Sequence, residues 1–195
     1  MATTRKSHSD SRLPQVLDQA ARLFRTLGFG GTSVRDIARA VGMLPGSLYC
    51  HFATKEALLS AVYVKGVEQI SAAVNAAVAH HTDPWQRLEA ACVAHLESIL
   101  RDDDYAQVVI RVHPADIPAA SPTLIDLRNR YEALFVELVK ALPLRANTDR
   151  RSFRLLLIGG LNSSQIWYRP NGRYKPRAIA HKFIALLHQG QELAQ

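Results

Sequence analysis

The sequence predicts an all-α protein, and three observations support this fold class. Apolar residues recur at spacings of three and four through most of the 195 residues, which is the period of amphipathic helices. Short breaks rich in Gly, Pro, Asp and Asn divide the chain into about nine such segments. No segment alternates as a half-buried strand does, and no internal repeat is visible. We therefore expect a small helical domain at the N-terminus and a larger one after it.

Composition favours a folded protein in a reducing compartment. Hydrophobic residues make up 48% of the chain and charged residues 21%, which is ordinary for a globular protein. Two cysteines, Cys50 and Cys92, do not make a disulfide framework at this size. The first residues lack the apolar core of a signal peptide, and the densest apolar run, 155–161, is too short to span a bilayer. These features predict a cytoplasmic protein.

The N-terminal segment is expected to hold a disordered basic arm and then one helix. Residues 1–10 are small and polar and have no apolar periodicity. A helix over about 11–27 follows, because Pro14 suits a first helical turn and Gly28 can end a helix. Its apolar residues fall on one face, namely Leu13, Val16, Leu17, Ala20, Phe24 and Leu27.

Three further helices are predicted before the histidine pair at 80–81. The first begins at Thr32 or Ser33, whose hydroxyl can cap free N–H groups, and ends at Gly42. A very short helix covers about 45–50. Thr54 then caps a long helix that reaches about residue 79.

Prolines and acidic caps divide the remainder into five helices. The expected ranges are 84–100, 105–115, 121 to the residue before Pro143, 150–168 after an Asn147-Thr148-Asp149 cap, and 176–193.

Charge is unevenly distributed along the chain, whose net charge is +7. Residues 1–65 carry nine basic and four acidic side chains, residues 66–144 six and eleven, and residues 145–195 nine and two. A basic N-terminal third is typical of proteins that bind a polyanion such as nucleic acid. A solvated basic surface would give the same count, so charge alone leaves both interpretations open.

The segment 32–52, TSVRDIARAVGMLPGSLYCHF, has the pattern of a helix-turn-helix. It contains a capped helix, a tight turn at Gly42 and a second short helix, which in this motif enters the major groove. The small residues Gly46 and Ser47 permit close approach to DNA. As an isolated element each part would be an ordinary amphipathic helix, but the combined spacing favours the motif.

From about residue 13 to 59 the sequence resembles the DNA-binding domain of the TetR family of bacterial repressors. The resemblance rests on an aromatic-containing first helix that ends in Gly, then Thr-x-Val-x-Asp-Ile-Ala, Gly, and Gly-x-Leu-Tyr-x-His-Phe-x-x-Lys. It implies that Thr32, Tyr49, His51 and Lys55 bind operator phosphates and that residues 44–50 face base edges. It also implies a homodimer, with two such motifs on a palindromic operator.

Three positions depart from the family pattern. Leu44 stands where Ser or Thr often caps the reading helix, Pro45 where a basic residue is common, and Cys50 where His, Tyr or Arg is frequent. Direct base readout is therefore expected to be sparse. The full set of candidate DNA-binding residues is Thr32, Val34, Arg35, Arg39, Leu44, Pro45, Gly46, Ser47, Tyr49, Cys50, His51 and Lys55.

Residues 80–195 carry no comparable motif, and the family resemblance there is architectural. It implies a small-molecule site and a four-helix dimer interface made by the last two helices. Phe153, Leu157, Gly160, Ser164 and Trp167 share one helix face, and Ile179, Phe183, Leu186 and Leu187 share another, so we expect these faces to meet the partner. We divide the chain into an arm (1–10), a DNA-binding domain (11–53) and a ligand-binding and dimerisation domain (54–195).

Polar residues on apolar faces are the candidate ligand-binding residues, since a buried polar group needs a partner. They are His95, Arg111, Asn162 and Gln165. A protein partner or water would serve each of them equally, and for His95 we favour that alternative.

The stretch 167–172, Trp-Tyr-Arg-Pro-Asn-Gly, resembles one in actinobacterial TetR members that control lipid or steroid catabolism. Nearby Arg169, Arg173, Lys175 and Arg177 suit an anionic group such as the phosphates of coenzyme A. A solvated loop is the alternative. The resemblance suggests an acyl-CoA or another lipid or steroid catabolite as the effector.

Rival functions have weaker support. The chain lacks a G-x-S-x-G elbow, a P-loop, a dinucleotide fingerprint and an H-E-x-x-H motif, so we expect no enzyme, cofactor or metal site. Adjacent His80 and His81 point apart on a helix, which disfavours a shared ion with His113. A ligand-independent repressor or an architectural DNA-binding protein remains the alternative.

Overall fold

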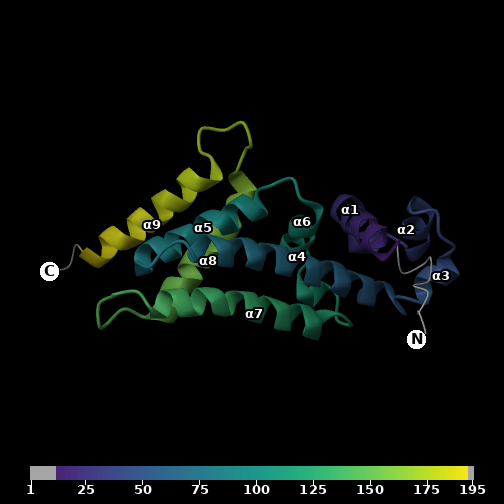
Figure 1. Cartoon of the computed structure of the whole chain (residues 1–195), viewed down its shortest axis with the longest axis horizontal. Coiled ribbons are helices and arrows are strands. Elements are labelled where there is room, and N and C mark those ends of the chain that lie inside the picture. Colours follow the sequence, from purple (N-terminus) through teal and green to yellow (C-terminus); the bar gives the residue numbers. More distant parts are fainter. Residues whose placement is uncertain (1–11, 193–195) are drawn as a thin grey trace, which may run out of the picture. The chain divides into compact units, whose positions relative to one another are not determined.

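The computed structural model describes residues 12–192, so the predicted arm at 1–10 lies outside the described residues. Within that range the chain has nine α-helices and one short 3-10 helix and no strand, which confirms the all-α prediction. The described chain divides into two compact units, residues 12–66 with 104–127, and residues 67–103 with 128–192. Figure 1 labels the helices along the chain. These units do not coincide with the functional domains expected from the sequence, which remain predictions.

The first unit contains the predicted helix-turn-helix. Its elements are α1 (Leu13–Gly31), α2 (Val34–Ala40), α3 (Pro45–Tyr49), the beginning of α4 (Lys55–Val78), α6 (Asp104–Arg111), the 3-10 helix η2 (Pro114–Asp116) and the beginning of α7 (Ser121–Lys140). The second unit contains the rest of α4 and α7, with α5 (Pro84–Ile99), α8 (Arg150–Trp167) and α9 (Pro176–Glu192).

Helix α1 extends beyond its predicted end. Gly28 has a φ of +74°, in the region that glycine adopts without a Cβ penalty, so the chain bends there and then resumes helical turns as far as Gly31. The next helix is capped by Ser33 and not by Thr32. The Asp36 N–H donates to the Ser33 hydroxyl and the Ser33 N–H donates to the Asp36 carboxylate, both at 3.2 Å, which completes a capping box.

Charged and hydroxyl groups join α1, α4 and α6 in the first unit. The Lys65 ammonium donates to Asp18 Oδ1 at 3.0 Å and to the Tyr105 hydroxyl at 2.8 Å, and that hydroxyl donates to Asp18 at 2.6 Å. Burial raises the pKa of Asp18, but the hydrogen bonds from Tyr105 and Lys65 outweigh it and leave the pKa below its ordinary value. Arg25 and Asp104 form a further ion pair of 2.8 Å between α1 and α6.

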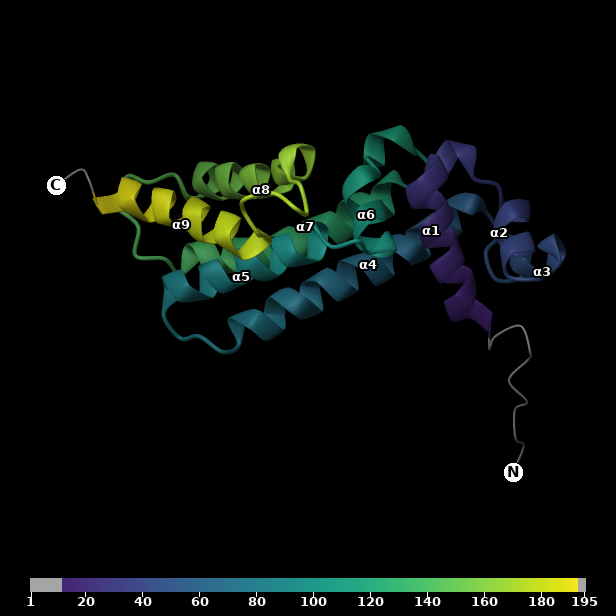
Figure 2. The same cartoon turned by 90° about the horizontal axis from the view of Figure 1, so that it is seen from above.

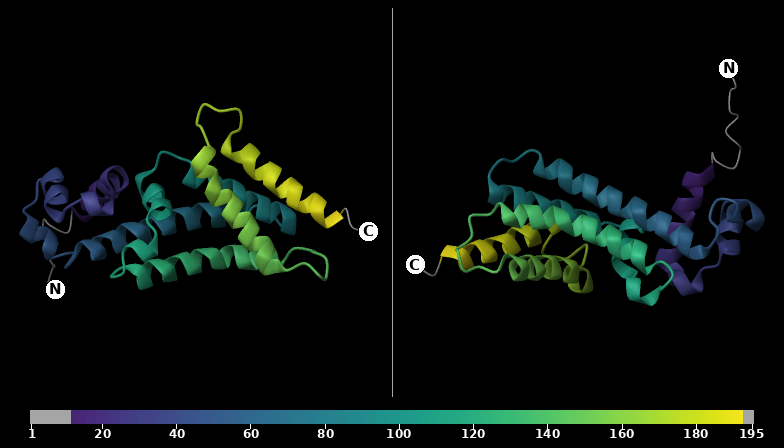
Figure 3. Two further views of the ribbon diagram at one scale, coloured as in Figure 1. Left: turned by 180° about the vertical axis from the view of Figure 1, so that it is seen from behind. Right: turned by 90° about the horizontal axis from the view of Figure 1, so that it is seen from below.

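In the second unit α5 packs along α9 and α8, with the ring of Trp85 against Phe153 and His188 at centroid distances of 6.3 and 4.4 Å. Helices α8 and α9 follow one another through a short loop (Figure 3, green and yellow ribbons). A Cβ atom on Gly160 of α8 would lie 3.1 Å from Cε2 of Phe183 in α9, so the two helices approach closely at this glycine.

Most of the face of α8 that we expected to meet a partner subunit instead packs within the chain. Phe153, Leu157 and Ser164 are buried in the protomer, and Gly160 contacts Phe183. For these residues the prediction was wrong, because α8 carries a second apolar stripe on its other side and the period alone does not say which stripe is internal. Trp167 of α8 and Leu186 of α9, which we also expected at the interface, are 47% and 68% exposed. The exposed stripe includes Leu155, Leu156, Gly159 and Ile166.

One described helix, α4, is long and apolar enough, by length and composition alone, to cross a membrane. Within its apolar 18-residue stretch, 44% of the residues are buried inside the protein. Leu58 and Leu59 lie fully buried in the first unit, and Ile70 and Val74 are buried in the second. The core helix of a soluble protein can have the same length and apolar composition, so packing explains the apolar character of α4.

Candidate functional site

Helices α2 and α3 form a helix-turn-helix (Figure 2). Gly42 makes the turn with a φ of +64°, and the Met43 N–H donates to the Ala38 carbonyl at 2.9 Å. Ile37 and Leu48 are fully buried and fix the two helices to the core of the unit. The opposite side of α3 is left facing solvent.

Most of the predicted DNA-binding residues lie on that solvent side. Leu44 is 76% exposed and Tyr49 is 49% exposed. Arg35, Arg39, Gly46 and Cys50 are also exposed, and Pro45, Ser47 and His51 are half-buried. The structure therefore leaves Arg35 and Arg39 of α2, and the side of α3 opposite Leu48, accessible to solvent.

Thr32 and Val34 are the exceptions, because both are buried. The Thr32 hydroxyl donates to the Gly28 carbonyl at 2.8 Å and so closes the bend in α1. Val34 lies in the core of the unit. The predicted DNA contacts of these two side chains are not favoured by their buried positions.

Lys55 is half-buried and makes three contacts within the chain. Its ammonium donates to the Phe29 carbonyl at 2.8 Å and to the Thr32 carbonyl at 3.0 Å, and it lies 4.1 Å from the centre of the Phe29 ring. Lys55 thus fastens the start of α4 to the segment between α1 and α2. Phosphate binding by Lys55 stays a prediction.

In the second unit the structure brings together two of the four predicted ligand-binding residues. His95 of α5 is 3% exposed; its Nε2 lies 3.1 Å from Asn162 Oδ1 and its Nδ1 lies 2.6 Å from the Tyr131 hydroxyl. Burial lowers the pKa of His95 to about 4, against the opposing effect of the Asn162 hydrogen bond, so the ring is neutral at pH 7. A neutral ring accepts from Tyr131 and donates to Asn162, which is the protein-partner alternative for His95.

The other two residues do not join this cluster. Arg111 is exposed at the end of α6 and belongs to the first unit. The Gln165 side chain donates to the Asn162 backbone carbonyl at 3.0 Å on its own helix.

Sequence reasoning missed Tyr131, which is not among the candidate ligand-binding residues. Tyr131 lies four residues after Leu127 and four before Phe135, and both neighbours are buried, so the spacing places all three on one side of α7. Its ring stacks on His95 at a centroid distance of 5.8 Å.

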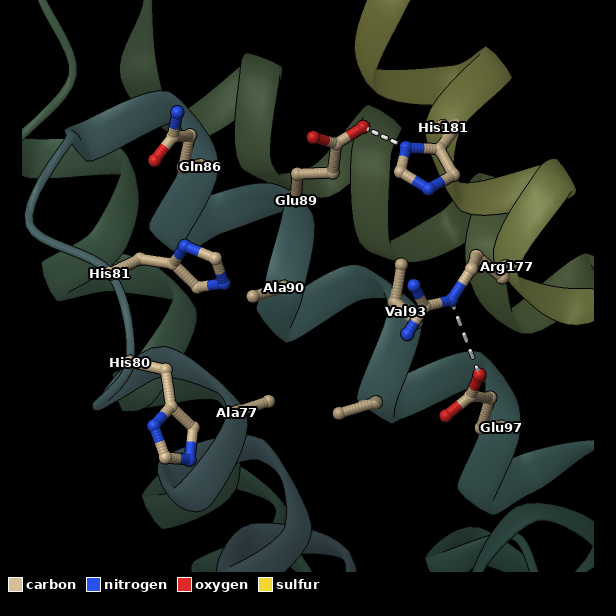
Figure 4. A pocket seen from close by; sticks show the side chains of 11 residues that line it. Ala77, His80, His81, Gln86, Glu89, Ala90, Val93, Glu97, Arg177 and His181 are labelled. Atoms are coloured by element: carbon tan, nitrogen blue, oxygen red, sulfur yellow. Dashed lines mark hydrogen bonds and ion pairs between the residues drawn. The ribbon is translucent and has the colours of Figure 1, made fainter.

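The second unit also has an open hollow of about 500 Å³, which the sequence did not suggest (Figure 4). Its floor consists of small or branched apolar residues of α4 and α5, namely Ala77, Ala90, Val93 and Ala94. Its rim is polar, with His80, His81, Gln86, Glu89, Glu97, Arg177 and His181. Two pairs link α5 to α9 across the rim, Glu89 with His181, and Glu97 with Arg177 at 3.9 Å.

The histidines of this hollow do not belong to a group of metal-ligating side chains among the described residues. No group of three or more His, Cys, Asp or Glu side chains able to hold a metal ion occurs among residues 12–192. His113, which the sequence raised as a third partner for His80 and His81, lies in the other unit.

A capped helix, a glycine turn and a short second helix with a solvent-facing side define the class of helix-turn-helix DNA-binding proteins. The family comparison makes this specific. Residues 16–62 match the family described as bacterial regulatory proteins, tetR family, and residues 81–191 match the tetracyclin repressor-like C-terminal domain. The chain belongs to the TetR family of DNA-binding transcriptional regulators, as the sequence predicted.

Individual relatives support this assignment over most of the chain. The HTH-type transcriptional repressor KstR2 of Mycobacterium tuberculosis is 29% identical over 188 residues, 93% of each chain. The HTH-type transcriptional activator FasR of Mycolicibacterium smegmatis is 26% identical over 159 residues, 81% of this chain and 73% of FasR. The crystal structure of AibR in complex with isovaleryl coenzyme A and operator DNA has a TM-score of 0.78 at 23% identity, covering 90% of this chain and 97% of AibR.

Proposed function

We propose that the protein is a cytoplasmic, homodimeric repressor that binds a palindromic operator and is released from it by a small molecule. The observation that carries this proposal is the exposed side of α3 within a segment that matches the family's DNA-binding domain. Relatives named as repressors favour repression, while a relative named as an activator keeps the sign of regulation a matter for experiment.

Dimerisation is supported by an apolar surface on the last two helices. Leu155, Leu156, Ile166 and Trp167 of α8 are 49%, 67%, 80% and 47% exposed, and Leu186 of α9 is 68% exposed. Gly159 lies in the same exposed stripe with open space beside it, which would admit a second helix closely. Several exposed large apolar side chains on two neighbouring helices are typical of a protein interface. We name this surface, Leu155, Leu156, Gly159, Ile166, Trp167 and Leu186, the α8–α9 face.

The proposed effector is an acyl-CoA or a related lipid or steroid catabolite. The named ligand of AibR is isovaleryl coenzyme A, which makes the compound class a reasonable first choice. The loop between α8 and α9 and the start of α9 carry Arg169, Arg173, Lys175, Arg177 and Lys182 without an acidic residue, as a polyphosphate would require.

The hollow supplies the apolar part of the proposed site. Arg177 belongs to both the basic stretch and the rim of the hollow, so we place the acyl group over the Ala77 and Ala90 floor and assign the phosphates to the basic stretch. The rim alone suits a polyanion poorly, since the carboxylates of Glu89 and Glu97 lie in it. The basic loop is therefore essential to this proposal.

An operator obtained by selection from random duplex DNA provides the test. Acyl-CoA thioesters of increasing chain length are added to the preformed complex, and release is followed by fluorescence anisotropy. We expect one chain-length range to release the operator, and reciprocity requires the operator to weaken binding of that thioester by the same factor. In vitro transcription from the same operator gives the sign of regulation.

Arg173→Gln and a matched control separate the effector site from DNA binding. Arg173 is exposed beside the Tyr174 ring, 5.3 Å from its centroid, and Arg128 is an exposed arginine of α7 in the same unit. Arg173→Gln should raise the thioester concentration needed for release without changing operator affinity, while Arg128→Gln should change neither. If no thioester in the panel releases the operator, the protein acts as the ligand-independent repressor of the alternative interpretation.

A further inference from the structure

The first turn of α3 contains no side chain able to make a hydrogen bond. Leu44 is the N-cap and makes no side-chain cap contact, Pro45 occupies the first helical position, and Gly46 follows it. Ser47 is the first polar side chain of the helix. This turn can therefore recognise a partner through its side chains only by apolar contact.

Leu44 is held in position although its side chain is free in solvent. Its carbonyl accepts from the N–H groups of Ser47 at 3.0 Å and Leu48 at 3.4 Å, and the fully buried Leu48 anchors the helix. The Leu44 side chain itself is 76% exposed, among the most exposed large apolar residues described. A fixed backbone that presents a leucine to solvent at the start of a reading helix points to a contact made only in the complex.

In a helix-turn-helix, the N-terminal residues of the second helix meet base edges in the major groove. Among the groups that the four base pairs present there, the one apolar group is the C5 methyl of thymine. We propose that Leu44, with the Pro45 ring beside it, selects a thymine in each half-site by contact with this methyl group. The proposal rests on the proposed function, since it assumes that α3 enters the groove.

This contact gives the helix-turn-helix a source of specificity that the arginines of α2 lack. Arg35 and Arg39 of α2 are exposed and can bind phosphates or guanine, but neither distinguishes thymine from cytosine by its methyl group. An apolar reader at Leu44 makes that distinction and also accepts 5-methylcytosine.

Deoxyuridine substitution tests the proposal, since it removes the methyl group and nothing else. The full chain first selects an operator from random duplex DNA, and each thymine is then replaced singly by deoxyuridine. One thymine in each half-site should be sensitive. A single deoxyuridine at either of these two positions should lower the wild-type affinity roughly fourfold, the effect of losing one buried methyl group. Replacement at both symmetry-related positions should lower it roughly fifteenfold.

Leu44→Ala, tested on the same operators, completes a double-mutant cycle between the leucine and the thymine methyl group. The variant should bind the thymine operator about as weakly as the wild type binds the deoxyuridine operator, and should not distinguish the two operators. When the same thymine is replaced by cytosine, the wild type should lose affinity for the operator. Replacement by 5-methylcytosine instead should restore the affinity of the wild type but not that of Leu44→Ala. Leu27→Ala is the matched control, because Leu27 is 56% exposed but lies in α1.

The outcomes are distinct. Failure to select any sequence would overturn the proposed function itself. A selected operator whose thymine methyls are all dispensable, or an equal methyl effect in Leu44→Ala, would overturn the role of Leu44 alone. An unchanged affinity of Leu44→Ala for the operator would assign the exposed leucine to a partner other than DNA and also contradict the proposal.

Discussion

Gly66 of α4 lies directly against Val109 of α6: a Cβ atom at position 66 would be 2.6 Å from Val109 Cγ2 and 2.9 Å from the backbone oxygen of Tyr105. Alanine has the higher helix propensity by about 1 kcal/mol, so propensity alone would predict a more stable variant. The clash includes backbone, which has little room to move, and we expect overpacking to decide the sign.

Gly66→Ala should therefore lower the free energy of unfolding by about 1–3 kcal/mol. The comparison is Gly30→Ala, since no atom lies within 4 Å of a Cβ atom there. Urea unfolding of both variants measures the effect, and a Gly66→Ala protein as stable as Gly30→Ala would contradict the close approach of α4 and α6.

His95 should make stability fall as the pH is lowered through a defined window. Its pKa is lowered to about 4 in the folded chain and is 6.5 in the reference state, so between these values the unfolded chain binds a proton that the folded chain does not. Stability is thus lost progressively from about pH 6.5 to 4, with a slope of up to about 1.4 kcal/mol per pH unit from this residue.

Replacement of His95 by Gln should remove that contribution to the slope while costing stability at pH 7, because Tyr131 and Asn162 lose a partner. Urea titrations at five pH values give the slopes of the wild type and the variant. Equal slopes for the wild type and His95→Gln would show that the buried ring does not titrate as described.

Leu156→Glu in the α8–α9 face should separate the proposed dimer into folded monomers. The side chain is 67% exposed in the protomer, so the charge costs little there but would be desolvated in a dimer. Val136→Glu, at a position on α7 that is 43% exposed, is the comparison. Analytical ultracentrifugation should show monomers only for Leu156→Glu, and a monomeric wild type or a dimeric Leu156→Glu protein would exclude this interface.

Lys55→Met should destabilise the first unit by about 1–3 kcal/mol, because its ammonium donates to the carbonyls of Phe29 and Thr32. Phosphate binding by the same residue would add a second effect. The slope of operator affinity against salt concentration would then decrease by about one per protomer. Thermal unfolding and salt titrations measure the two effects independently, and a variant unchanged in both would leave Lys55 without either role.

The sequence predicted the helices well where caps and prolines mark their ends. Asp83 and Asp149 accept from N–H groups of their first turns, as expected of capping residues, and Pro84 and Pro176 begin helices. Gly28 shows the limit of such signals, because a bend and a helix end both require the same positive φ.

Tertiary partners were harder to predict than helices. Arg111 interrupts an apolar run, but only the fold shows that α6 belongs to the first unit and leaves this side chain in solvent. The hollow combines residues from α4, α5 and α9 that are separated by up to about a hundred positions, and no local period encodes such a surface. Tyr131 was predictable from its spacing and was missed.

The most direct test of the central claim is selection of DNA by the full chain and by Tyr49→Ala. Tyr49 is 49% exposed on α3, so the variant should fold normally. We predict that the wild type enriches one palindromic sequence from random duplexes and binds it at least about a thousandfold more tightly than scrambled DNA at physiological salt. Tyr49→Ala should bind both DNAs more weakly. If the wild type enriches no sequence, or if Tyr49→Ala binds as the wild type does, α3 is not the DNA-reading helix.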